Sequence, residues 1–142
     1  MLLIFLNAAL ADVPVLDLRA HDADARFPSD AAVLTVAFPQ MTFADAAILV
    51  CDGHAGMIDA GGYAEESAVQ TALEALGVTR LDWVVATHPH ADHIGGMEEV
   101  IEAFPIGHFY LGAETSNTAT YGRMLDALEA HDVPTSVPQD GD

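Results

Sequence analysis

The chain has very few basic residues. Its 142 residues include no lysine and only 4 arginines, against 22 aspartates and glutamates, so the formal net charge is -18. A field of this sign repels polyanions at long range, and nonspecific nucleic-acid binding depends on basic side chains at phosphates. The composition therefore argues against a basic nucleic-acid-binding surface.

Cysteine is equally scarce. Cys51 is the single cysteine, which excludes an intrachain disulfide. Its neighbours are apolar and strand-like, so packing in a core is favoured over nucleophilic chemistry.

Long hydrophobic runs are missing as well. The apolar run Met1 to Ala11 is too short to cross a bilayer as a helix, so we predict no transmembrane span. It ends in an A-x-A pattern and resembles a signal peptide with a short start, which predicts an exported or extracellular protein. The alternative is a first core strand in a cytoplasmic protein. We interpret residues 1–30 as this signal and an extended leader, and residues 31–142 as one domain.

Apolar residues make up 51% of the chain, enough for a buried core. Strand-like and helix-like stretches alternate after an Asp52-Gly53 hairpin signal, which predicts an α/β layered domain. Helical spacing predicts that Tyr121, Met124, Leu125 and Leu128 face inward. We expect strands at 32–38, 46–50, 56–60, 81–86, 106–111 and 133–137, and helices at 64–76, 97–104 and 116–130.

The most informative stretch is 81–96, LDWVVATHPHADHIGG, in which a short β-prone run precedes a cluster of ligand-type residues. His88 and His90 stand two residues apart, so in extended backbone their imidazoles project to the same side. Asp92 and His93 follow where the chain turns toward a helix. Imidazoles with a carboxylate suit zinc, with iron or manganese as alternatives. An incidental histidine-rich surface loop is the competing interpretation, and the spacing disfavours it.

This stretch resembles the H-x-H-x-D-H signature of the metallo-β-lactamase superfamily of metal-dependent hydrolases. The resemblance implies that His88, His90, Asp92 and His93 are metal ligands. It also implies that Asp92 acts in catalysis by helping to orient the attacking water. The expected cofactor is zinc, with two ions in a complete family domain.

A second stretch extends the resemblance. Residues 45–50 and 58–62, either side of the predicted hairpin, are similar to the opening hairpin of the competence-type branch, some members of which are attached to DNA-uptake channels. A glycine usually precedes the aspartate matched by Asp45, and here Ala44 stands there. The position of Asp59 implies a carboxylate that orients a ligand histidine. Turn capping is the alternative for Asp59.

The resemblance implies an αββα sandwich, of which we expect only the first half here: a mixed sheet with helices on one face. The remaining ligands of a two-metal site would then lie outside the chain. We expect a zinc-dependent hydrolase acting on a small-molecule or phosphodiester substrate. The alternative is a truncated or catalytically inactive fragment that serves as a metal-binding or interaction module. An exposed half-sandwich would also favour self-association.

Overall fold

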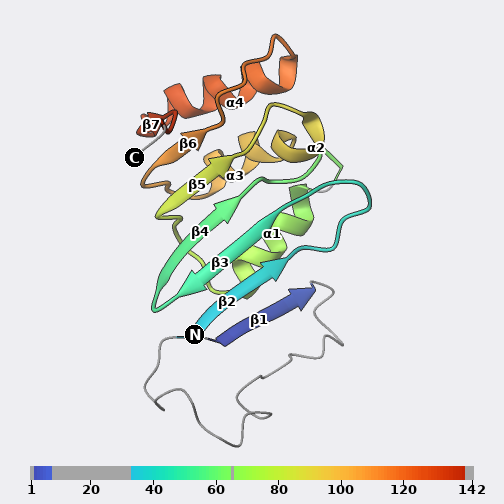
Figure 1. Cartoon of the computed structure of the whole chain (residues 1–142), viewed down its shortest axis with the longest axis vertical. Helices are drawn as coiled ribbons and strands as arrows, with labels where there is room; N and C mark the ends of the chain where they lie inside the picture. The colour runs from blue at the N-terminus through green and yellow to red at the C-terminus, as the bar shows by residue number, and fades with distance from the viewer. Residues whose placement is uncertain (1, 8–32, 65, 140–142) are drawn as a thin grey trace, which may run out of the picture.

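The frame of the molecule is a single mixed sheet (Figure 1). The computed structural model describes residues 2–7, 33–64 and 66–139. Within these residues seven strands lie side by side in sequence order. The pairs β2/β3 and β3/β4 are antiparallel, and the other pairs are parallel. The strands are β1 (Leu2–Asn7), β2 (Val33–Phe38), β3 (Ala47–Cys51), β4 (His54–Ile58), β5 (Trp83–Ala86), β6 (Phe109–Leu111) and β7 (Thr135–Ser136).

A two-residue turn joins β3 to β4. Asp52 and Gly53 both have positive φ, 50° and 80°, as the first-choice two-residue hairpin turn requires. The predicted hairpin is therefore confirmed.

The helices cover one face of the sheet and enclose the core (Figure 1). They are α1 (Glu66–Ala75), α2 (Ala91–Ile94), α3 (Met97–Ala103) and α4 (Ala119–Ala130). Ile48, Met57, Val84 and Phe109, one from each of four adjacent strands, are fully buried beneath them. The predicted mixed sheet with helices on one face is confirmed. The short helix α2, which carries Asp92 and His93, is an addition to the predicted elements.

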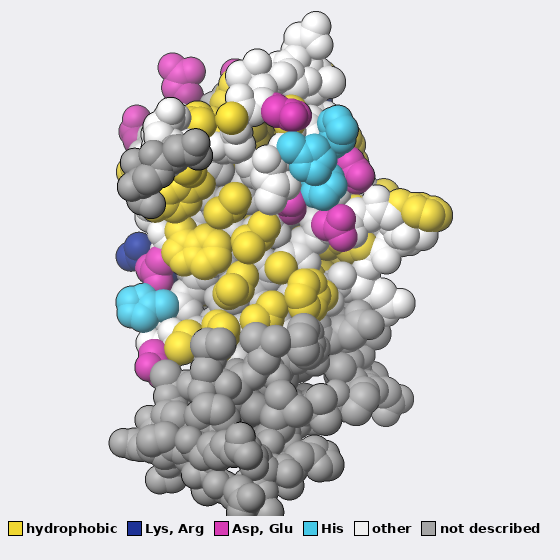
Figure 2. All heavy atoms as spheres, in the orientation of Figure 1, with side chains coloured by type: hydrophobic (Ala, Val, Ile, Leu, Met, Phe, Trp, Pro, Cys, Tyr) yellow, Lys and Arg dark blue, Asp and Glu magenta, His cyan; other side chains and the backbone are white. Residues whose placement is uncertain are grey.

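The opposite face of the sheet is apolar and open (Figure 2). Successive side chains of a strand point to opposite faces, so the neighbours of the buried core residues point away from the helices. Ile58, Val85 and Tyr110 form one row across three strands on this face, and each is partly exposed. Beside them the indole of Trp83 lies over Gly56, where an added Cβ would meet the ring at 2.1 Å. We call this surface, defined by Ile58, Trp83, Val85 and Tyr110, the open face.

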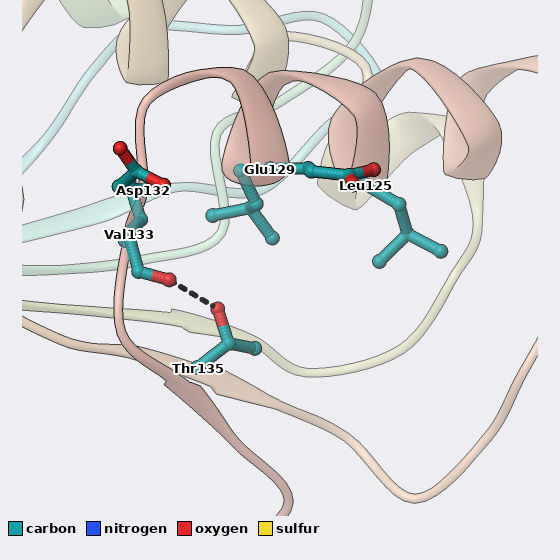
Figure 3. A pocket seen from close by; sticks show the side chains of 6 residues that line it. Leu125, Glu129, Asp132, Val133 and Thr135 are labelled. Atoms are coloured by element: carbon teal, nitrogen blue, oxygen red, sulfur yellow. Dashed lines mark hydrogen bonds between the residues drawn. The ribbon is translucent and has the colours of Figure 1, made fainter.

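One predicted inward residue is exposed. Tyr121, Met124 and Leu128 are buried, whereas Leu125 is 37% exposed. Leu125 lines a groove between the end of α4 and β7 (Figure 3). There the Thr135 hydroxyl donates a hydrogen bond of 2.9 Å to the carbonyl of Val133. The prediction for Leu125 was wrong because the buried face of α4 is narrower than the set of apolar residues at helical spacing in its sequence.

The start of the chain adds a strand to the sheet. Leu2–Asn7 forms β1, which pairs in parallel with β2 at the edge of the sheet. The leader expected over residues 12–30 lies outside the described residues. Across the described part of the chain, no helix is both long and apolar enough for a membrane span. Export and the domain boundary at residue 31 stay predictions.

Candidate metal centre

The predicted ligands lie where β5 passes into α2, at one edge of the sheet. His90 is the N-cap of α2 in extended conformation, with φ -81° and ψ 146°. Its carbonyl accepts hydrogen bonds from the backbone N–H groups of His93 and Ile94, each at 3.0 Å. The strand, the extended loop and the helical turn therefore present the four predicted ligands within one short segment.

Backbone contacts hold α2 against the loop that follows β4. The N–H of Ala60 donates a hydrogen bond to the carbonyl of His93 at 2.8 Å, and the N–H of Gly96 donates one to the carbonyl of Gly61 at 3.2 Å. Gly95 lies so close to this loop that an added Cβ would meet the Tyr63 nitrogen at 2.7 Å and the Gly62 carbonyl carbon at 2.8 Å. A glycine is required there because two backbone segments meet.

The three motif histidines are gathered together. The ring centroids of His88 and His90 lie 4.7 Å apart, and those of His88 and His93 lie 3.9 Å apart. Figure 2 shows histidine and acidic side chains beside one another at the rim of the apolar open face. Residues that are adjacent in the motif therefore converge in space.

Asp59 anchors this group from the end of β4. Its side chain is only 6% exposed, and its backbone adopts a positive φ of 55°. Its Oδ1 accepts a hydrogen bond from the backbone N–H of Thr87 at 2.8 Å. Its Oδ2 accepts from the Thr87 hydroxyl at 2.6 Å and pairs with Nδ1 of His93 at 2.8 Å. Asp59 thus contacts His93, one of the predicted ligands, and it also holds the loop through Thr87.

These bonds also determine which nitrogens of the histidines carry protons. The acid Asp59 is an acceptor when ionised, so Nδ1 of His93 donates and Nε2 keeps its lone pair. The Thr87 hydroxyl has one hydrogen, which it donates to Asp59, so it accepts from Nδ1 of His88 at 3.0 Å. Both imidazoles therefore have Nε2 available, as a metal ligand requires.

Two carboxylates face the free nitrogen of His93. Oδ2 of Asp92 lies 3.7 Å from Nε2 of His93, and Oδ2 of Asp45 lies 3.9 Å from it. Asp92 is the predicted member of this group. Asp45 comes from the loop between β2 and β3, and sequence reasoning assigned it no metal role. The available signal was an aspartate two residues before a strand, β3, that begins at the same edge of the sheet.

The donor set suits a divalent metal ion in its chemistry. It combines imidazole nitrogens and carboxylate oxygens, the ligands preferred by zinc. In the conformation described, however, no group of three or more histidine, cysteine, aspartate or glutamate side chains within the described residues is arranged to hold an ion. The side chains of Asp92 and Asp45 are 53% and 83% exposed, so the surrounding protein does not enclose them.

Two other histidines have partners elsewhere in the fold. Nδ1 of His54 lies 2.7 Å from Oδ2 of Asp82, beyond the opposite end of β5. This hydrogen bond lowers the pKa of Asp82 below its usual value, although burial acts in the opposite direction and raises it. His108 pairs with the hydroxyl of Ser136 at 2.8 Å.

The family is decided by a match to a family model. Residues 52–141, more than half of the chain, match the model described as the metallo-beta-lactamase superfamily. The chain belongs to this superfamily. Proteins of the metallo-beta-lactamase superfamily generally bind metal ions, often zinc.

Two curated proteins are similar to part of this chain. The anti-Pycsar protein Apyc1 of Paenibacillus xerothermodurans is 40% identical over 65 residues, which cover 44% of this chain and 24% of that protein. The hydroxyacylglutathione hydrolase of Acidiphilium cryptum (strain JF-5) is 33% identical over 88 residues, which cover 58% of this chain and 33% of that enzyme. The chain thus spans a third or less of the curated relatives it matches.

Solved structures confirm the superfamily fold. A Thermotoga maritima protein described as a metallo-beta-lactamase aligns with a TM-score of 0.53 and 17% identity over 78% of this chain and 60% of its own. The metallo-beta-lactamase SMB-1, in complex with mercaptoacetic acid, aligns with a TM-score of 0.51 and 13% identity over 74% and 44%. At these identities the likeness shows the fold alone, and it covers part of the superfamily domain.

Proposed function

We propose that the chain is a zinc-dependent hydrolase. The observation that carries the proposal is the hydrogen-bonded set Asp59, Thr87, His88 and His93, which leaves Nε2 of both imidazoles free. A histidine that served only packing would not need its tautomer held by a buried carboxylate.

His88 and His90 are proposed to hold one ion, and Asp92 and His93 a second. A bound zinc ion lowers the pKa of water to about 7 and polarises the oxygen of the group under attack. Iron or manganese would suit the same donors less specifically.

Asp92 is proposed to act in catalysis as well as in binding. Its carboxylate is 53% exposed at the start of α2 and faces the same side as His93 Nε2. An acceptor in that position can hold a water by one of its hydrogens and take up a proton during hydrolysis. Asp59 would hold the imidazole of His93 in place beside this carboxylate.

The proposed substrate class is a phosphodiester. The proposal rests on the resemblance of residues 45–50 and 58–62 to the competence-type branch. The hydrolase from Acidiphilium cryptum, named for hydroxyacylglutathione, supports a second candidate substrate. The net charge of -18 disfavours a long polyanion and favours small substrates in either case.

A second function is favoured by one specific observation. Because the chain covers 24% and 33% of the two curated relatives, a metal-binding or interaction module without hydrolysis is the alternative.

Metal analysis and hydrolysis assays on the purified chain test both functions. With added zinc we expect bound metal and hydrolysis of bis-p-nitrophenyl phosphate, and the double variant His88→Ala, His90→Ala should lose both. S-lactoylglutathione tests the second substrate class. Bound zinc without hydrolysis of either substrate would favour the module, and unchanged metal content in the double variant would refute the site.

A further inference from the structure

We infer that Asp45 is a metal ligand that completes the Asp92 and His93 pair from within this chain. The inference rests on the proposed function, because it concerns the ion assigned to that pair. It adds a donor from a loop distant in sequence, to which the motif gives no role.

The geometry around His93 carries the inference. Nδ1 of His93 is engaged by Asp59 at 2.8 Å, so the ring cannot rotate freely. Its Nε2 then faces two carboxylates, Asp92 at 3.7 Å and Asp45 at 3.9 Å, both too far for a hydrogen bond. Two ligands bound to one zinc at about 2.0–2.2 Å in tetrahedral geometry lie about 3.4 Å apart. The observed spacings exceed this by a few tenths of an ångström, which side-chain rotation can close.

The backbone of Asp45 is held at this position although its side chain is exposed. Its N–H donates to the carbonyl of Asp92 at 3.2 Å, and its own carbonyl accepts from Gly61 at 3.0 Å. The same loop packs on Gly61, where an added Cβ would meet the Met41 sulfur at 2.6 Å. Because the backbone of Asp45 is already anchored, binding an ion would cost only the rotamer entropy of its side chain.

The charges around His93 also support a cation at this position. Asp45, Asp59 and Asp92 surround one imidazole, and even a protonated histidine would balance only one of them. In a chain with a net charge of -18 there is no general excess of cations to compensate the other two. A divalent cation between Asp45, Asp92 and His93 would relieve this repulsion.

The test compares zinc and cobalt binding by the full chain and its variants. Asp45→Asn should weaken binding of the ion that depends on His93 by at least about tenfold, the scale known for partners of metal ligands. It should also change the visible absorption of bound cobalt. Asp45→Glu should restore part of both signals. Asp126→Asn, on the exposed side of α4, removes the same charge away from the site and serves as the matched control.

The possible results separate the inference from the proposed function. Equal losses for Asp45→Asn and Asp126→Asn, or a loss that disappears in about 0.5 M salt, would mean a general charge effect and would overturn the inference. Wild-type affinity in Asp45→Asn, with His93→Ala still defective, would overturn it while the proposed function stands. If the wild-type chain binds neither metal, both fail. Unchanged thermal unfolding of the metal-free variants would exclude misfolding as the cause.

Discussion

The carboxylate of Asp59 pairs with Nδ1 of His93 at 2.8 Å across 34 residues of sequence. The same carboxylate holds the backbone and hydroxyl of Thr87, so the end of β4, the end of β5 and helix α2 meet at one buried acid. The orientation of the candidate metal centre therefore depends on a residue outside the histidine motif.

Replacing this acid should loosen the centre. Asp59→Asn keeps the shape but cannot accept hydrogen bonds as a carboxylate does, so we expect zinc affinity to fall about 10–100-fold in calorimetric titration. Asp82→Asn is the matched control, since it removes a carboxylate that binds the exposed His54. Equal affinities for the Asp59 variant and the wild type would contradict the orienting role.

Gly95 should not tolerate a side chain. Gly95→Ala places Cβ 2.5 Å from the Ala91 carbonyl oxygen and 2.7 Å from the Tyr63 nitrogen, both backbone atoms. We expect a loss of about 1–3 kcal/mol in the free energy of unfolding, measured in urea, because two segments must separate. Gly122→Ala in α4 meets nothing within 4 Å and should instead stabilise by up to about 1 kcal/mol. Equal effects of the two changes would argue against the close approach.

Glu98 should make stability depend on pH. Burial, followed by repulsion from neighbouring carboxylates, raises the pKa of Glu98 above its usual 4.5, although Nε of Arg123 lies 2.9 Å from its Oε2. An acid with a raised folded-state pKa binds its proton more tightly when folded, so its contribution to stability declines as pH rises through 4.5 and the raised value.

The variant Glu98→Gln isolates this contribution. Between about pH 4 and about pH 7 it should lose less stability in urea than the wild type does. Glu129→Gln, at an exposed position of α4, controls for the removal of one negative charge. Parallel pH profiles of the wild type and the Glu98 variant would show that the ion pair with Arg123 offsets burial.

The open face predicts self-association. Ile58, Trp83, Val85 and Tyr110 form a continuous apolar surface, and such surfaces commonly mark interfaces. We expect sedimentation to show species larger than a monomer, and Val85→Lys should shift them toward the monomer. Leu125→Lys, also at an exposed apolar residue but on α4, should not. If the wild type sediments as a monomer at every concentration tested, this prediction is wrong.

Much of the fold could be predicted because its signals are local. Alternating apolar residues, the Asp52-Gly53 turn and helical spacing each depend on a few neighbouring residues, and the corresponding strands and helices lie where expected. Leu125 was wrongly predicted to be buried because the apolar pattern of one helix does not show how much of that helix the neighbouring elements cover. Helix α2 was not anticipated because a four-residue helix has too few residues to show a period.

The sequence by itself predicted the superfamily and the ligand types, since H-x-H-x-D-H places imidazoles and a carboxylate within one short segment. Only the tertiary structure decided which groups orient them. Asp59 and Asp45 reach His93 through strand pairing and loop packing between segments far apart in the chain, and Asp59 also binds Thr87, which contacts its neighbour His88. A hydrogen bond or a metal ligand is set by distance in space, and no spacing along the sequence encodes that distance.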